Sequence, residues 1–464
     1  MGYSGFKLES WFHEFVKKAL YINDGPWPIT REKIDIYRLV CLQRILNYAY
    51  SKSDFYRNQY DKIGFKPELC RSLDDIAGIP LTEQAALRYE PYKLLCISAG
   101  DVERVITFTT SGTTGLQKKV FFSSDDLNNM INFMGIGLSH VISEGETIVI
   151  LLPDSGPGGQ ARLLAEGART IGAVPVIASA GQDVSGQLEL IRRTKPAVVF
   201  GTTDGIYRLT QAGKLHLDLA GLGVRVVYVT SDFVSQTVRK NMEDAWAAEV
   251  YVHYGMTEMG LGVAVECPAH DGYHFNERDL LIEVVDPHSG KPLGFGEEGE
   301  LVFTTLRRQA MPLIRYRTHD VARVTDAPCQ CGASSLLKIT RVSRRLESTV
   351  SLSQGVNIYP GMFDEVIYQV PQVVDYQITV NGNGDGEVID LEVEVSENGA
   401  DMGHQIAQKL SSVACLRDLL DRRLLRIGKI VLLAPGGLKR SVRAKKIILD
   451  KRFARLTHAN GKKK

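Results

Sequence analysis

The chain has 464 residues, which exceeds one ordinary domain and predicts about two or three. Hydrophobic residues make up 44% and charged residues 23%, as in globular proteins, and a formal net charge of +1 provides no general attraction for nucleic acid or an anionic membrane. With seven cysteines and no apolar signal-peptide core in the first twenty residues, we expect a soluble, cytoplasmic protein whose partner is a small molecule.

Helix signals open the chain and strand signals follow. Residues 32–60 carry apolar side chains at helical spacing, which predicts amphipathic helices. Short apolar runs separated by helix-length segments come next, at 147–153, 173–178, 197–202 and 224–230. Buried runs that alternate with helices are typical of parallel strands with helical crossovers. The fold class we predict is therefore α/β, with parallel-sheet layers in a large N-terminal domain.

The pattern changes in the last third of the chain. From about Leu280, two strands around a Gly/Pro turn predict a small β element appended to the large domain. Beyond about Arg341 helices and strands mix, with helices expected at 361–369 and 401–414 and strands at 374–380 and 387–395. This part of the sequence predicts a smaller α+β domain.

The segment after the apolar run at 104–108 is rich in hydroxyl groups and glycine. It contains Thr109, Thr110, Ser111, Gly112, Thr113, Thr114 and Gly115, followed by Lys118 and Lys119. Glycine lets the backbone approach a ligand, hydroxyl and N–H groups donate to phosphate oxygens, and lysine neutralises their charge. We interpret the segment as a phosphate-binding loop rather than a polar surface loop. The Walker order is missing, which disfavours a kinase or P-loop ATPase.

This loop resembles the phosphate-binding signature of the adenylate-forming superfamily of acyl-CoA synthetases, luciferases and adenylation domains. Two later segments resemble further motifs of that superfamily, in the same order. Tyr254, Gly255, Met256, Thr257 and Glu258 are similar to the adenine-stacking and Mg²⁺-binding motif, and 312–320 is similar to the segment whose aspartate, here Asp320, holds the ribose. The chemistry fits, because a tyrosine face can stack on a base and carboxylates can bind Mg²⁺ or accept from vicinal hydroxyls.

Within the superfamily the nearest resemblance is to the phenylacetate-CoA ligase branch. It covers nearly the whole chain and includes the phrases at 55–57, 79–82 and 299–306. The resemblance implies a large ATP- and acid-binding domain over 1–342, a hinge over 343–349 and a mobile C-terminal lid domain over 350–464. It also implies ATP, Mg²⁺ and coenzyme A as cofactors, and an aromatic or related carboxylic acid as substrate.

Two family motifs are degenerate here. The hinge motif corresponds to 344–348, where Arg345 can still clamp phosphate and Glu347 stands at the hinge aspartate. The C-terminal lysine motif can be aligned in two ways, which place either Ala444 or Lys445 at the catalytic lysine. We prefer Lys445, and expect the neighbouring lysine at 446 to point elsewhere. The alternative is a basic segment that faces water.

Cysteine and histidine form a second constellation. Cys267 and His270 make one close pair, and Cys329 and Cys331 make another, with His274 as an alternative to His270. Two pairs of soft ligands can close a tetrahedral shell, for which Zn²⁺ is the usual ion. We predict structural rather than catalytic zinc, because a closed shell leaves no position for water.

The expected function is AMP-forming acid–thiol ligation through an acyl-adenylate, with CoA or an acyl carrier protein as acceptor. We expect the acid pocket near 154–160, 201–207 and 230–233, and we place Ser231 and Asp232 among the binding residues. One rival is a family member that has lost adenylation and moves acyl groups between CoA and a carrier thiol. Another is a non-catalytic nucleotide sensor. A homodimer is left open.

Overall fold

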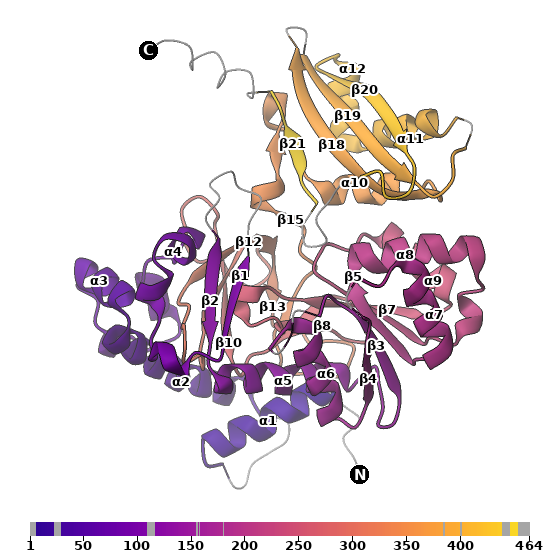
Figure 1. Cartoon of the computed structure of the whole chain (residues 1–464). Coiled ribbons are helices and arrows are strands. Elements are labelled where there is room, and N and C mark those ends of the chain that lie inside the picture. Colours follow the sequence, from indigo (N-terminus) through magenta and orange to yellow (C-terminus); the bar gives the residue numbers. More distant parts are fainter. Residues whose placement is uncertain are drawn as a thin grey trace. The chain divides into compact units, whose positions relative to one another are not determined.

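The computed structural model describes residues 6–22, 29–108, 117–154, 156, 158–179, 181–383, 386–399, 401–438 and 446–452. The chain divides into two compact units. Unit 1 contains residues 1–180 and 251–342, and unit 2 contains residues 181–250 and 343–464. Figure 1 shows the chain and labels many of its helices and strands. Among the described residues, no helix combines the length and the apolar character needed to cross a membrane.

Unit 1 begins with helix α1 (Lys7–Ala19), and the helices predicted over 32–60 follow as α2 (Arg31–Lys52) and α3 (Asp54–Ile63). On α2 one face is buried, with apolar side chains such as Leu42 and Ile45, while Ile36 and Val40 are exposed. Two arginines of the same helix, Arg31 and Arg38, lie 2.6 and 3.7 Å from the buried carboxylate of Glu277. These ion pairs tie the helical opening to the rest of the unit.

A strand hairpin and two parallel strands follow in unit 1. After α4 (Gln84–Tyr89), strands β1 (Arg104–Phe108) and β2 (Lys118–Phe122) pair antiparallel. Strands β3 (Thr147–Leu151) and β4 (Val174–Ile177) pair in parallel, as predicted, and are connected by α6 (Gln160–Thr170). Helix α6 packs beside α5 (Ser124–Leu138), whose Gly135 approaches the Gly167 backbone too closely for a Cβ atom.

The remaining strands of unit 1 carry most of the predicted nucleotide motifs. Strands β8 (Ala264–Glu266) and β9 (Tyr273–Phe275) follow β7 (Glu249–Tyr254), and β9 also pairs with β14 (Lys338–Ile339), itself paired with β13 (Val324–Thr325). The predicted small β element is an antiparallel sheet of β10 (Leu280–Val285), β11 (Gly299–Thr305) and β12 (Tyr316–Ala322). Its third strand, β12, holds the segment that ends in Asp320.

Unit 2 joins a helix–strand layer to the C-terminal part of the chain. The predicted parallel strands β5 (Val198–Thr202) and β6 (Val226–Thr230) are accompanied by α7 (Val184–Thr194), α8 (Thr203–His216) and α9 (Gln236–Trp246). The short strands β15 (Arg344–Arg345), β16 (Val350–Ser351) and β17 (Asn357–Ile358) lead to α10 (Pro360–Ile367). Helix α10 packs on α9.

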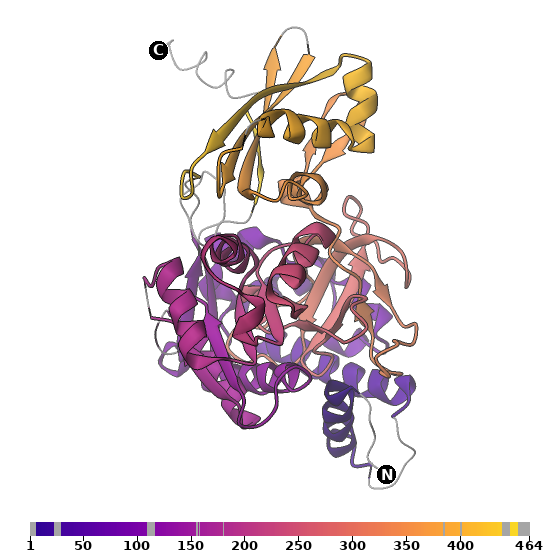
Figure 2. The ribbon, with the colours of Figure 1, turned by 90° about the vertical axis from the view of Figure 1, so that its right-hand side faces the viewer.

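The C-terminal part of unit 2 is the predicted α+β fold, with differences in detail. Strands β18 (Val373–Asn383) and β19 (Gly386–Val395) form the expected hairpin, which β20 (Leu425–Leu433) and β21 (Ile448–Asp450) extend at either side. The helix expected at 401–414 ends at Ser411, and α12 (Ala414–Asp421) follows α11 (Met402–Ser411). Both helices pack on the same face of the sheet (Figure 2).

Candidate functional site

The predicted phosphate loop is framed by strands β1 and β2. The loop residues singled out from the sequence, Thr109 and Thr110 to Gly115, lie outside the described residues. Phe108, the last residue of β1, pairs with Lys118, the first residue of β2, so the two strands hold the ends of the loop together.

Lys118 lies in a buried polar cluster. Its side chain is only 3% exposed, and its Nζ lies 2.9 Å from Oε1 of Glu258. The same Nζ donates to Oε1 of Gln84 and lies 3.5 Å from the hydroxyl of Tyr316, whose O–H donates to Oε1 of Glu258 at 3.0 Å. We refer to Gln84, Lys118, Glu258 and Tyr316 as the buried quartet. It joins the lysine and the acid that the sequence assigned to two separate motifs.

The backbone around Glu258 holds its carboxylate in this cluster. Glu258 lies in a single 3-10 turn, Thr257–Met259, that ends at Gly260 with a φ of 103°. The guanidinium of Arg308 donates to the carbonyl oxygen of Glu258, and burial lowers the pKa of Arg308 to about 10. Oε2 of Glu258 makes no hydrogen bond to any described residue. Within the described part of the chain, Oε1 is therefore held by two side chains and Oε2 by none.

The adenine and ribose motifs also come together in unit 1. The hydroxyl of Tyr254 donates to Oδ2 of the buried Asp320 at 2.9 Å, and the Tyr254 ring stacks on Tyr273. A Cβ atom on Gly255 would lie 2.3 Å from the carbonyl oxygen of Leu261, so only glycine fits this turn. Met256 and Thr257 continue the same turn toward Glu258. The motif is thus one continuous support that carries an aromatic ring and a carboxylate.

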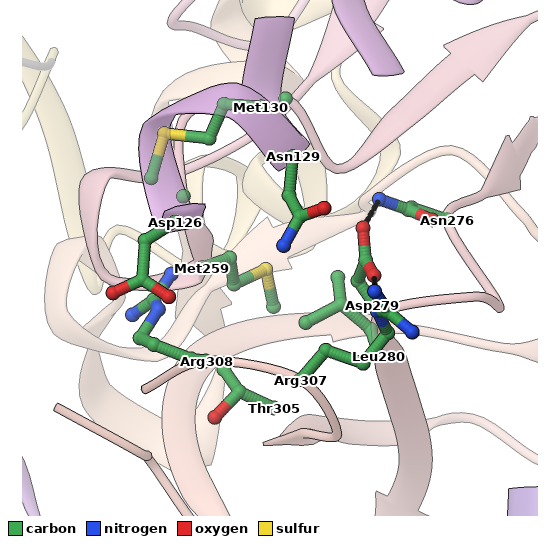
Figure 3. Close-up of a pocket in the computed structure, with 12 residues that line it drawn as sticks. Asp126, Asn129, Met130, Met259, Asn276, Asp279, Leu280, Thr305, Arg307 and Arg308 are labelled. Carbon is green, nitrogen blue, oxygen red and sulfur yellow. Dashed lines mark hydrogen bonds and ion pairs between the residues drawn. The ribbon is translucent and has the colours of Figure 1, made fainter. Parts of the chain in front are cut away.

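A small pocket lies beside the Glu258 turn (Figure 3). Its lining includes Met259 and Gly260 from the turn, Asn129 and Met130 from α5, and Arg308. The cavity volume is about 40 Å³, which suffices for a few water molecules but for neither a nucleotide nor an aromatic acid.

In unit 2, the residues that follow β6 form a strained corner. Ser231 has a φ of 85°, and the hydroxyl of Thr203 donates to the carbonyl oxygens of Thr230 and Asp232 at 3.2 and 3.4 Å. Oδ1 of Asp232 accepts from the N–H of Phe233 at 2.9 Å. A non-glycine residue with a positive φ is costly, which is consistent with a corner shaped for binding.

The expected acid-pocket acid at 154 has a local partner. Arg162 on α6 donates twice to Asp154, with both distances at 2.9 Å, and this pairing lowers the pKa of the carboxyl group. Asp154 is therefore engaged with its own neighbourhood in unit 1.

The hinge and lysine motifs are described in part. Arg345 ends β15, and its carbonyl oxygen accepts from the hydroxyls of Ser348 and Thr349, while Glu347 lies in the intervening 3-10 turn. Lys445 lies outside the described residues. Lys446 is described, and its ammonium group is paired rather than solvated.

Lys446 binds within unit 2. Its Nζ lies 2.7 Å from Oδ1 of Asp364 and 2.9 Å from the hydroxyl of Tyr368. It also lies 4.3 Å from the centre of the Tyr376 ring, and its backbone N–H donates to Oδ2 of Asp232 at 3.3 Å. A lysine enclosed by the carboxylates of Asp364 and Asp375 and by two aromatic rings has a structural role in this conformation.

Four residues of types that can hold a metal ion cluster in unit 1, namely Cys267, His274, Cys329 and Cys331, and their candidate ligand atoms all lie within 4.8 Å of one another. Sγ of Cys267 lies 3.6 Å from that of Cys329, and Sγ of Cys331 lies 3.4 Å from Nε2 of His274. Nδ1 of His274 lies 3.2 Å from the carbonyl oxygen of Leu337, which directs Nε2 into the cluster. Three thiols and one imidazole fit a tetrahedral zinc shell.

The structure therefore selects His274 in place of His270. His270 follows Cys267 in a turn, adopts a φ of 51°, and lies with its ring against Tyr251 and with Nδ1 3.5 Å from Glu266. His274 instead lies on β9, directly paired with Lys338 of β14. The Cys-x-x-His spacing favoured His270, but the strand pairing brings the later histidine to the thiols.

Two members of the buried quartet were not assigned to the site from the sequence. Tyr316 lies inside the 312–320 segment, which was recognised as a motif, but the sequence did not predict its contact with Glu258. Gln84 has no local signal, because its partner Lys118 is 34 positions away in the sequence.

Sequence and fold comparisons place this chain among known proteins. The family model described as "AMP-binding enzyme" matches residues 98–307, and that described as "AMP-binding enzyme C-terminal domain" matches residues 355–452. The phenylacetate-coenzyme A ligase of Thermus thermophilus is 30% identical over 89% of this chain and 95% of its own length. The phenylacetate-coenzyme A ligase of Escherichia coli is 30% identical over 82% of this chain and 87% of its own. A crystal structure of 2-hydroxyisobutyryl-CoA ligase in the postadenylation state matches 94% of this chain and 96% of its own, with a TM-score of 0.76 and 21% identity.

Proposed function

Because the chain belongs to the AMP-binding enzyme family, in its phenylacetate-CoA ligase branch, we propose that it joins an aromatic or arylacetic acid to coenzyme A. ATP-dependent formation of an acyl-adenylate and then of a CoA thioester is the activity of this family. The preference for an aromatic acid is supported by the relatives at 30% identity, whose names specify phenylacetate. The observation that carries the proposal is the buried Lys118–Glu258 pair at the foot of the phosphate loop.

In the first half-reaction the acid carboxylate attacks the α-phosphorus of ATP, and pyrophosphate leaves. The loop at 110–115 and Lys118 bind phosphate oxygens, Tyr254 with Gly255, Met256 and Thr257 forms the adenine support, and Asp320 accepts from the ribose. Glu258 would hold Mg²⁺ through its carboxylate group; when bound, the ion would neutralise charge on the phosphates. Lys445 and Arg345 supply further positive charge to the phosphates.

In the second half-reaction the thiol of CoA attacks the acyl carbonyl carbon, and AMP leaves. We assign the large domain to 1–342, the hinge to 343–349 around Glu347, and the lid to 350–464. Rotation of the lid removes the adenylation lysine and admits the thiol, which lets one site serve two reactions. Ser231 and Asp232, on the strained corner after β6, contribute to the substrate-binding wall.

Zinc has a structural role in this proposal. Cys267, His274, Cys329 and Cys331 hold it, and they join the β8–β9 connection to the loop before β14. A closed shell of four protein ligands contributes folding free energy and leaves no position for a reacting water.

The test is a half-reaction assay across a panel of acids. Exchange of labelled pyrophosphate into ATP is measured with phenylacetate, benzoate and an aliphatic 2-hydroxy acid, with a no-acid control, and thioester formation with CoA is measured in parallel. We expect exchange and thioester formation with the aromatic acids. Preference for the aliphatic acid would overturn the substrate class. ATP binding without exchange, or acyl transfer from CoA to a carrier thiol without exchange, would overturn ligation in favour of a sensor or a transferase.

A further inference from the structure

We propose that, before the nucleotide binds, Lys118 stands in for Mg²⁺ at Glu258, held there by Gln84 and Tyr316 as positioning residues. The proposal rests on the function proposed above and adds a charge exchange to it: on binding of Mg²⁺ with ATP, Lys118 leaves Glu258 for the phosphates.

Burial makes the pairing of Lys118 and Glu258 necessary. Their side chains are 3% and 4% exposed, and an unpaired charge at either position would be strongly destabilising. The ammonium lies 2.9 Å from Oε1, a hydrogen-bonded ion pair. In the nucleotide-free protein, Lys118 therefore holds the Glu258 carboxylate in a fixed direction.

The two uncharged members of the quartet each form a hydrogen bond to one of the two charged side chains and leave its charge unchanged. Tyr316 donates to Oε1 of Glu258 at 3.0 Å, and Gln84 accepts from Lys118. Tyr316 can thus retain Glu258, and Gln84 can retain Lys118, when the ion pair opens. Oε2 has no hydrogen bond to a described residue, so the carboxylate can accept a cation without losing Tyr316.

The position of Lys118 explains where it goes. It is the first residue of β2, directly after the loop segment, and its Nζ lies 5.6 Å from the centre of the Phe108 ring at the opposite end of that loop. Lys119, the next residue, points to the other face of the strand, where its Nζ lies 3.3 Å from the hydroxyl of Tyr92. Only the inward lysine can exchange between an acid and a phosphate.

The test measures thermal stability with Mg²⁺ alone, in the absence of ATP, acid and CoA. In the parent, Lys118 occupies Glu258, and 10 mM Mg²⁺ should leave the unfolding temperature unchanged. In Lys118→Met the carboxylate loses its cation, so Mg²⁺ should raise the unfolding temperature by about 2 °C or more. Adding Glu258→Gln to Lys118→Met should remove that response. Lys119→Met, matched in chemistry and one position away, should behave as the parent.

A second measurement examines the positioning residues in proteins that keep Lys118. Calorimetry gives the ratio of affinities for a non-hydrolysable ATP analogue with and without Mg²⁺. Tyr316→Phe should reduce this ratio by about tenfold, the effect of one hydrogen bond to a charged group. Tyr37→Phe, which loses a buried 2.9 Å bond to the carbonyl oxygen of Arg278 in the same unit, should not change it.

Three results would overturn the proposal. The first is that Mg²⁺ alone raises the unfolding temperature of the parent as much as that of Lys118→Met, and the second is that it does not raise the unfolding temperature of folded Lys118→Met. The third is that Tyr316→Phe leaves the ratio of ATP-analogue affinities with and without Mg²⁺ unchanged. If Lys118→Met does not fold, the calorimetric ratio decides. The thermal test contains no substrate, so a negative result in it does not contradict the proposed ligase activity. Equally, if the parent shows no pyrophosphate exchange, the thermal test can still be interpreted.

Discussion

Glu258→Gln changes both stability and chemistry, because Glu258 neutralises a buried lysine. Lys118 is 3% exposed and its Nζ lies 2.9 Å from Oε1. The amide oxygen of the glutamine can still accept a hydrogen bond from Lys118, but the substitution removes the negative charge that balances the ammonium group. We therefore expect the free energy of unfolding to fall by about 1–3 kcal/mol, the cost of weakening a hydrogen bond to a buried charged group. Glu258→Ala removes the acceptor too and should cost about 3–5 kcal/mol.

The catalytic effect of the same change should be larger. Loss of one group aimed at developing charge costs about 100-fold to 1,000-fold in rate, so pyrophosphate exchange by Glu258→Gln should fall by that factor even at saturating Mg²⁺. Urea unfolding and isotope exchange measure the two effects separately. Glu189→Gln removes one partner of an exposed ion pair, 2.7 Å from Arg192, and is the matched control; it should leave the free energy of unfolding nearly unchanged. Parental exchange in folded Glu258→Gln would remove Glu258 from the mechanism.

Three further changes probe other parts of the chain. The four-residue Cys/His cluster should hold one zinc ion per chain. His274→Ala and Cys329→Ser should each lose the zinc in metal analysis and lower the unfolding temperature, whereas His270→Ala should keep both. Substoichiometric zinc in the well-folded parent would contradict this prediction. Arg208→Ala removes the guanidinium that lies 2.9 and 2.5 Å from the buried carboxylates of Asp375 and Glu394. It should lower the free energy of unfolding by about 3–5 kcal/mol and speed hydrogen exchange in β18 and β19, whereas Arg192→Ala should do neither. Burial lowers the pKa of His13 below its ordinary value of about 6.5. The neutral imidazole therefore stabilises the fold fully above that pH, and this stabilisation is lost as the pH falls below it. The free energy of unfolding should decline by up to about 1.4 kcal/mol per pH unit in that range, and His13→Gln should reduce this dependence on pH.

The fold could be predicted where the signal is local. The four apolar runs became the parallel pairs β3/β4 and β5/β6, because buried strands need continuous apolar sequence. The helix at 401–414 was drawn too long, because Leu410 before the break and Leu416 after it are both buried and continue one apolar pattern. Periodicity does not register a break when both helices face the same sheet.

The site could be predicted as a set of residues but not as a network. Each motif marked its own ligand, Lys118 in one and Glu258 in another, yet their pairing spans 140 positions. Gln84 joins them from a helix whose sequence gives no chemical signal. The same limit explains His270: spacing within a turn is local, whereas the pairing of β9 with β14 that places His274 is not.

Lys446 is held by contacts within unit 2, and these contacts decide how the lysine motif should be tested. Lys446→Ala is not a neutral control, because it leaves the buried Asp364 without its cation at 2.7 Å and should destabilise unit 2 by about 3–5 kcal/mol. Lys429, an exposed cation on β20, is the better control.

Lys445→Ala should abolish carboxylate-dependent pyrophosphate exchange and spare thioester formation from a supplied acyl-adenylate, because the lysine serves only the first half-reaction. Lys446→Ala should lower both reactions together with stability, and Lys429→Ala neither. Parental exchange in Lys445→Ala would instead favour the alignment that places Ala444 at the lysine position, and another cation would then serve the α-phosphate.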